Sequence, residues 1–102
     1  MTHVLSPHWQ EKVVFSPAGP QPLVLTENAK FKVIIAGLEP GQKIPPHPEA
    51  AAVYQFLDGS GWMQVDDIRF AVAGGATVIT PEGATRGIEA GTRLAFLATR
   101  LA

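Results

Sequence analysis

The residues best suited to chemistry lie in the stretch GQKIPPHPEA, residues 41–50. His47 stands there between two prolines, and the carboxylate of Glu49 follows two positions later. An imidazole and a carboxylate can both bind a transition metal, and an imidazole also transfers protons near neutral pH. The stretch is therefore compatible with a metal site, with a working site of another kind, or with an ordinary loop.

Several other kinds of site are not expected from the composition. The chain has no cysteine, which excludes disulfides, thiolate nucleophiles and cysteine-ligated zinc or iron–sulfur centres. It has no Gly-x-Ser-x-Gly elbow and no glycine-rich loop that opens a helix. The sequence therefore favours neither a serine hydrolase nor a nucleotide-dependent enzyme.

The charges are balanced and scattered. Eight Lys and Arg stand against nine Asp and Glu, without a run of either sign, so we expect no nucleic-acid partner and no anionic membrane surface. The first residues, MTHVLSPHWQEK, lack the apolar core of a signal peptide, and no stretch approaches the roughly 20 apolar residues of a transmembrane helix. We expect a cytoplasmic protein whose partner is a small molecule or a second copy of the chain.

Short apolar runs between glycines and prolines predict an all-β protein. A chain of 102 residues, 46% of them hydrophobic, fits a single domain over residues 1–102 with one core. Ten Gly and nine Pro argue against long helices. Asp66-Asp67 is expected to form a hairpin turn. The expected strands are 13–15, 23–26, 31–38, 51–57, 62–65, 68–72, 76–80 and 93–99.

Residues 1–28 are expected to form an extended N-terminal arm and the first strands, because Pro17, Pro20 and Pro22 keep this part extended. Such arms often cross to a partner subunit, and a loosely held end is the alternative. In residues 52–57 both alternating faces are mostly apolar. This favours a strand covered by the barrel interior on one side and by a second layer or subunit on the other. We therefore predict a homodimer, with a wide monomeric sandwich as the alternative.

Two stretches resemble the paired motifs of the cupin superfamily, a family of small jelly-roll β-barrels. GQKIPPHPEAAAVYQFLDG (41–59) is similar to the family pattern Gly, five residues, His-x-His, three or four residues, Glu, six residues, Gly. GATVITPEGATR (75–86) is similar to Gly, five residues, Pro-x-Gly, two residues, His, three residues, Asn. The resemblance covers roughly residues 33–98 and implies that these form a two-motif cupin barrel behind the arm.

The metal-binding positions that the resemblance implies are mostly substituted. His47 falls on the first metal-binding histidine, and Glu49 takes the place of the second. Ala52 replaces the glutamate, with the loop one residue short, while Arg86 replaces the histidine of the second motif and Ala90 the asparagine. Since an arginine offers no lone pair and repels cations, we expect no standard metal cofactor. A divalent transition metal on His47 and Glu49 is the alternative.

The position of Arg86 suggests an anion site instead. If its side chain points into the barrel, the guanidinium at the pocket floor would suit a carboxylate or phosphate held by two parallel hydrogen bonds. The alternative is that Arg86 pairs with Glu49 or Glu89 and only satisfies an internal charge.

The predicted ligand-binding residues are His47, Glu49, Tyr54, Trp62 and Arg86. Tyr54 and Trp62 have simpler roles as alternatives, Tyr54 in core packing and Trp62 in covering the barrel end. The preferred function is binding of a small organic anion, in a binding, sensing or accessory role. One alternative is a cupin enzyme, either a metal-dependent oxygenase or a metal-free isomerase or epimerase with His47 as the catalytic residue. A barrel kept only for subunit contacts is another.

Overall fold

The computed structural model of the chain describes residues 2–102, so Met1, the first residue of the expected arm, lies outside the described residues. Residues 2–102 contain one short 3-10 turn, η1 (Trp9–Glu11), and none of their helical segments is long and apolar enough to cross a membrane. The strands are β1 (Leu23–Glu27), β2 (Phe31–Leu38), β3 (Lys43–Pro48), β4 (Ala52–Asp58), β5 (Ser60–Val65), β6 (Ile68–Ala73), β7 (Thr77–Thr80), β8 (Thr85–Ala90) and β9 (Leu94–Leu101).

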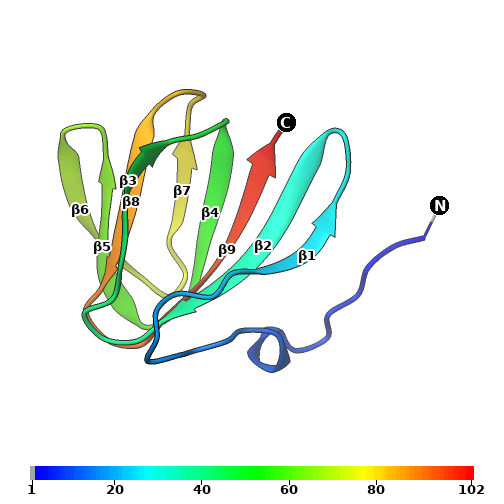
Figure 1. Cartoon of the computed structure of the whole chain (residues 1–102), viewed down its shortest axis with the longest axis horizontal. Helices are drawn as coiled ribbons and strands as arrows, with labels where there is room; N and C mark the ends of the chain where they lie inside the picture. Colours follow the sequence, from blue (N-terminus) through cyan, green and yellow to red (C-terminus); the bar gives the residue numbers. More distant parts are fainter. Residues whose placement is uncertain (1) are drawn as a thin grey trace.

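The strands form two antiparallel sheets, which face each other across the core (Figure 1). One sheet has the order β1-β2-β9-β4-β7 and the other the order β3-β8-β5-β6. Strands that are distant in sequence therefore lie side by side, as β2 does with β9 and β3 with β8. This arrangement confirms the prediction of an all-β jelly roll.

The core is built from alternate residues of the strands, as the two-residue period of a strand requires. On β4 the side chains of Ala52, Tyr54 and Phe56 are buried, as their alternation predicts. Phe56 lies opposite Phe96 of β9, with ring centroids 5.9 Å apart. Met63 and other side chains of the second sheet close the core from the opposite side.

Two strands are missing from the sequence prediction, and one predicted strand is absent among residues 2–102. β3 contains Pro45 and Pro46, which lack N–H groups, but β3 is an edge strand with a bulge between Ile44 and His47 that accommodates them. β8 was missed because its sequence, TRGIEA, is not an apolar run. Residues 13–15 form no strand and instead cover the sheet at Gly37, where a Cβ atom would lie 2.7 Å from the Phe15 ring.

The hairpin between β5 and β6 confirms the turn predicted at Asp66-Asp67. Val65 pairs with Ile68, which leaves the two aspartates as the loop. Asp66 has a φ of 51°, a left-handed conformation that aspartate tolerates better than most residues. Its Oδ1 also accepts a hydrogen bond from the Thr85 backbone N–H at 3.0 Å, so the turn is tied to β8.

Candidate functional site

A cavity of about 380 Å³ lies between the two sheets. Much of its wall is apolar, and the polar part includes four of the five predicted site residues. The apolar residues include Ile34, Ile44, Ile88, Phe96 and Ala98, and the predicted polar ones are His47, Glu49, Tyr54 and Arg86.

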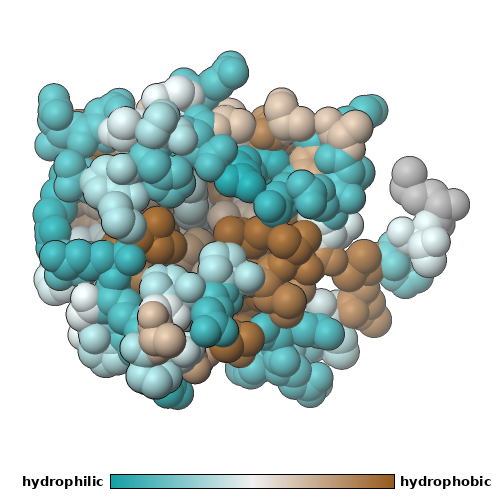
Figure 2. Space-filling view, in the orientation of Figure 1, coloured by the Kyte–Doolittle hydropathy of each residue, from teal (hydrophilic) through white to brown (hydrophobic). Residues whose placement is uncertain are grey.

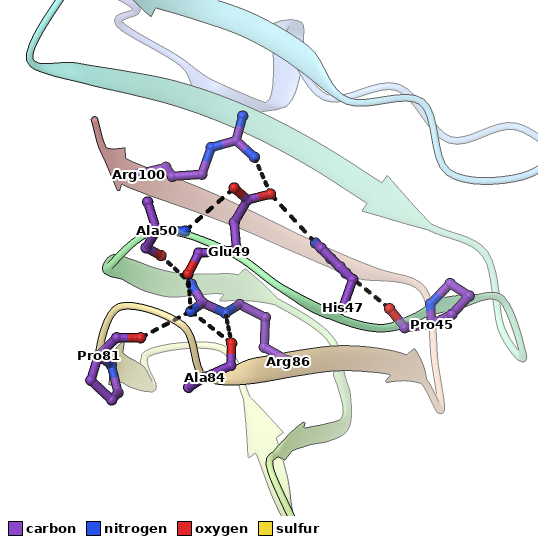
Figure 3. A network of polar contacts seen from close by, with 8 residues as sticks. All are labelled: Pro45, His47, Glu49, Ala50, Pro81, Ala84, Arg86 and Arg100. Atoms are coloured by element: carbon purple, nitrogen blue, oxygen red, sulfur yellow. Dashed lines mark hydrogen bonds and ion pairs between the residues drawn. The ribbon is translucent and has the colours of Figure 1, made fainter.

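Glu49 links two of the polar groups at this cavity (Figure 3). Its Oε2 lies 2.7 Å from Arg100 Nη1 and 3.7 Å from His47 Nε2. His47 Nδ1 lies 3.0 Å from the Pro45 carbonyl oxygen. Because a carbonyl can only accept, the hydrogen of this contact belongs to Nδ1, and Nε2 is turned toward Glu49. The bulge at Pro45 and Pro46 sets this position of His47 on β3.

The structure gives Arg86 hydrogen-bond partners that neither prediction named. The residue is 1% exposed, and its guanidinium donates to four backbone carbonyls, as Figure 3 shows. Nη1 donates to Ala50 at 2.6 Å, and Nη2 donates to Glu49 and Pro81, each at 3.0 Å. Nε and Nη2 both donate to Ala84. The guanidinium therefore joins the segment after β3 to the turn before β8, and most of its donors are taken up by the backbone.

The internal ion pair expected for Arg86 is also replaced by other pairs. Glu49 pairs with Arg100, and Glu89 pairs with Arg69 at 3.1 Å. Arg86 is thus a buried cation held by carbonyl dipoles, without a carboxylate partner among residues 2–102. Its charge still lies at the cavity wall.

Tyr54 lies on the inner face of β4 and is 8% exposed. Burial raises the pKa of its phenol above the usual value, and the nearby Arg86 guanidinium only partly opposes this rise. The hydroxyl therefore stays protonated at neutral pH and can donate a hydrogen bond to a ligand in the cavity.

This environment predicts an alkaline titration with one clear signal, because Tyr54 is the only tyrosine of the chain. Tyrosinate absorbance should rise with a midpoint above pH 10, the value for an unperturbed tyrosine being about 10. Since the unfolded chain ionises first, the stability contributed by Tyr54 is complete below pH 10 and is lost as the pH rises through the higher folded pKa. Tyr54→Phe should remove the signal, and a midpoint at or below pH 10 would contradict the burial.

Two cationic residues of the cavity, Lys32 and Arg100, were missed in the sequence. They are direct partners across β2 and β9, and both line the cavity. The signal that would have found them is strand alternation: the inward series that starts at Leu38 reaches Lys32, and the series from Leu94 reaches Arg100. Both lie outside the two motifs. Arg100 pairs with Glu49, whereas no carboxylate of the described chain forms an ion pair with Lys32.

Trp62 does not line the barrel cavity. It alternates with the buried Met63 and therefore faces the outer side of β5, where it is 39% exposed. It lines a separate groove of about 240 Å³ on that surface. The Arg69 guanidinium carbon lies 5.1 Å from the centroid of the Trp62 ring, in a cation–π contact. Its predicted place among the ligand-binding residues is thus corrected.

The residues present do not fit a metal centre of the kind that the motif resemblance implies. No group of three or more His, Cys, Asp or Glu side chains positioned to hold a metal is found within residues 2–102. His47 and Glu49 come close to each other, but Glu49 is engaged by Arg100. The register partner of His47 on β8 is Arg86, which cannot act as a ligand.

No family model matches the sequence, and no curated protein matches it. Solved structures do match over nearly the whole chain. An RmlC-like cupin protein from Desulfovibrio desulfuricans is 25% identical with a TM-score of 0.87, and the alignment covers 97% of each chain. A conserved protein of unknown function from Streptococcus pyogenes is 20% identical with a TM-score of 0.86, over 99% of this chain and 90% of that one.

A third similar structure is an uncharacterised conserved protein with a double-stranded β-helix domain from Klebsiella pneumoniae. It is 20% identical with a TM-score of 0.84, and the alignment covers 100% of this chain and 98% of that one. These likenesses agree with the jelly-roll topology and assign no ligand.

Proposed function

Because the chain has the cupin fold, we propose that it binds a small organic anion in the barrel cavity. The carboxylate or phosphate of the ligand is held by Lys32 and Arg100, and its organic part packs against the aliphatic wall. The observation that carries this proposal is the pairing of these two cations across β2 and β9 on the inner face of the cavity.

The charge balance of the cavity supports an anionic ligand. Three cations line it, Lys32, Arg86 and Arg100, against one carboxylate, Glu49. Like charges directly opposite each other on neighbouring strands destabilise a sheet. Glu49 compensates Arg100, which leaves the charge of Lys32 without a carboxylate in the described chain. An anion bound between Lys32 and Arg100 would relieve this repulsion and gain charge-assisted hydrogen bonds.

The size and lining of the cavity support a small ligand with an apolar part. A volume of about 380 Å³ lies near the lower end of the range for ligand pockets. Ile34, Ile44 and Ile88 provide apolar contacts that an inorganic ion could not use. Tyr54 also lines the cavity, and its hydroxyl offers the ligand a polar contact.

Replacing Lys32 tests the proposal. Lys32→Met should weaken binding of small carboxylates or phosphate monoesters about ten- to a hundredfold, the usual loss for one charge-assisted hydrogen bond. Binding is measured by a thermal-shift screen followed by calorimetric titration. The melting temperature of the ligand-free variant should not fall, because the repulsion with Arg100 is removed.

Lys30→Met is the matched control, because Lys30 lies two residues away in an exposed bend outside the cavity. Its variant should bind like the parent chain. Equal affinity of the Lys32 variant and the parent chain for every anion that binds would refute this assignment of the site.

A second candidate is a metal-free enzyme that moves a proton with His47. The observation that favours it is the His47 Nε2 atom, which faces Glu49 at 3.7 Å in the cavity wall. An imidazole in this position is suited to general acid–base work. Exchange of ligand C–H protons with deuterium from heavy water, lost in His47→Gln, would distinguish catalysis from binding alone.

A further inference from the structure

The groove beside Trp62 lies on the outer face of the sheet β3-β8-β5-β6, on the other side of this sheet from the barrel cavity. Its volume is about 240 Å³. Gly87 of β8 has no side chain, and Pro46 of the β3 bulge lies so close that a Cβ atom on Gly87 would be 2.9 Å from the Pro46 nitrogen. Trp62 and Gln64 of β5 line the other side of the groove. A bottom made of backbone and a proline ring fits a flat ligand.

The volume and the surroundings of the groove restrict the ligand further. Ligand pockets usually measure about 300–1,000 Å³, so a groove of about 240 Å³ fits a molecule with a single ring. Figure 2 shows mostly hydrophilic residues on the side where Figure 1 draws β5 and β6, whereas hydrophobic residues gather over β1 and β2. A ligand of the groove therefore needs a polar group beside its apolar ring.

Arg69 provides a partner for that polar group. It lies on the edge strand β6, and its side chain reaches past Trp62 of β5 to Glu89 of β8, where Nη1 donates to Oε1 at 3.1 Å. This is the only hydrogen bond that the Arg69 guanidinium donates within residues 2–102. The edge formed by Nε and Nη2, a fork whose geometry matches a carboxylate, is therefore unused.

Arg93 shows how the same edge is used elsewhere in the molecule. Like Arg69, it lies over an aromatic ring and pairs with a glutamate: its guanidinium carbon is 4.4 Å from the centroid of the Phe15 ring, and its partner is Glu39. Arg93 holds this carboxylate with Nε at 2.6 Å and Nη2 at 3.3 Å. In Arg69 the corresponding two nitrogens have no carboxylate partner within the described chain.

The charges that line the groove also favour an anion. Lys43 and Arg69 are its cations, and Glu89 is its single carboxylate. Glu89 pairs with Arg69. Lys43 is the register partner of Glu89 across β3 and β8, yet no carboxylate of residues 2–102 forms an ion pair with it. One positive charge of the groove is therefore left without compensation.

We propose that the outer groove is a second binding site, for a small aromatic carboxylate. The ring of the ligand packs on Pro46 and Gly87 beside Trp62, and its carboxylate accepts two parallel hydrogen bonds from Nε and Nη2 of Arg69. Lys43 adds the second positive charge. Trp62 thus contacts a ligand on the outer face of β5 and not in the barrel cavity. The cations of this site differ from those that carry the proposed function, so either site can stand without the other.

The two tryptophans of the chain provide the first test, with benzoate as the probe. Trp62 lines the groove and Trp9 lies in η1, so a proton–nitrogen correlation spectrum holds one indole N–H signal at the site and one as an internal reference. Titration with benzoate should shift the Trp62 signal to saturation and leave the Trp9 signal in place. A Trp62 signal that does not saturate up to the solubility limit of benzoate would overturn the proposal.

Benzamide tests the charge of the ligand. It has the ring of benzoate but no negative charge, so it should bind at least about tenfold more weakly, the usual effect of losing a charge-assisted hydrogen bond. Equal dissociation constants for benzamide and benzoate would overturn the assignment of a carboxylate.

Replacing Arg69 tests the residue that holds the carboxylate. Arg69→Met should weaken the benzoate titration of the Trp62 signal about ten- to a hundredfold. Arg93→Met is the matched control, because Arg93 is also exposed, lies over an aromatic ring and pairs with a glutamate, but lines neither the groove nor the cavity. This control should bind benzoate like the parent chain. Unchanged affinity in Arg69→Met would overturn the site, and its melting curve shows whether the fold is kept.

A further variant separates the groove from the barrel cavity. Ile44, Gly87 and Ile88 line both, so an anion bound in the cavity can also shift the Trp62 signal. Lys32→Met removes the anion site proposed for the cavity and should leave the titration of the Trp62 signal unchanged. A shift that is lost in Lys32→Met and kept in Arg69→Met would mean that benzoate binds only in the cavity. That result would overturn the groove site and leave the proposed function standing.

Discussion

Arg86→Met is expected to lower the free energy of unfolding by about 3 kcal/mol or more, although Arg86 contacts no carboxylate. The substitution removes a buried donor to four backbone carbonyls. The Glu49 and Pro81 carbonyls each keep one backbone N–H donor, whereas the Ala50 and Ala84 carbonyls lose the guanidinium without such a replacement. Domains of this size have total stabilities of about 5–15 kcal/mol, so the loss is a large share of the whole. Urea denaturation followed by circular dichroism measures it.

Two further variants separate the structural role of Arg86 from a role in binding. Arg86→Lys should also destabilise the fold, because a single ammonium group cannot reach carbonyls on both segments. Arg69→Met is the control: this arginine is exposed and pairs with Glu89 on the surface, so its loss should change stability by about 1 kcal/mol or less. An Arg86→Met variant with the stability of the parent chain, but without anion binding, would restore the receptor role that the carbonyl contacts argue against.

Gly59→Ala should destabilise the barrel by about 3 kcal/mol, the sum of two unfavourable effects. Gly59 has a φ of 86°, which costs an alanine about 1–2 kcal/mol. An added Cβ would also collide with the backbone carbonyl of Arg93, and such overpacking costs about 1–3 kcal/mol. The measurement is the midpoint and slope of a denaturant unfolding curve.

Gly75→Ala isolates the steric part of this effect. Gly75 has a similar φ of 97°, but no atom lies within 4 Å of the Cβ that alanine would add. Its variant should therefore lose only about 1–2 kcal/mol, from the left-handed conformation alone. Equal losses at Gly59 and Gly75 would show that the bend at Arg93, just before β9, can move away from Gly59 at little cost.

The fold could be predicted because the glycines of its motifs meet requirements of local backbone geometry. The four glycines that fix the spacing of the two motifs, Gly41, Gly59, Gly75 and Gly83, all have a positive φ. Such positions favour glycine whatever the rest of the chain contains. The edge strand β3 was not predicted, because its prolines are tolerated only through a bulge that depends on tertiary pairing.

The location of the site could be predicted from the sequence, but the hydrogen-bond partners of its side chains could not. His47, Glu49, Tyr54 and Arg86 all line one cavity, as expected from their motifs and from strand alternation. The hydrogen-bond acceptors of Arg86 are backbone carbonyls. Every residue has a backbone carbonyl, so no residue type in the sequence marks these acceptors. For that reason an arginine bound to the backbone could not be distinguished from one that offers its donors to a ligand.

Trp62, Lys32 and Arg100 show that alternation along a strand decides which side chains face the cavity. Trp62 was predicted among the ligand-binding residues, whereas its alternation with the buried Met63 puts it on the outer face of β5. Lys32 and Arg100 were overlooked because they lie outside the motif segments, although the same alternation places them inside.

The buried guanidinium of Arg86 also determines what holds the segments around the cavity together. In a metal-centred barrel, an exchangeable cation would draw the surrounding segments together, and their order would vary with metal supply, chelators and pH. Here the cation that joins the segment at Glu49 and Ala50 to the turn at Pro81 and Ala84 is covalently part of the chain. The walls of the cavity are thus preorganised in every folded molecule.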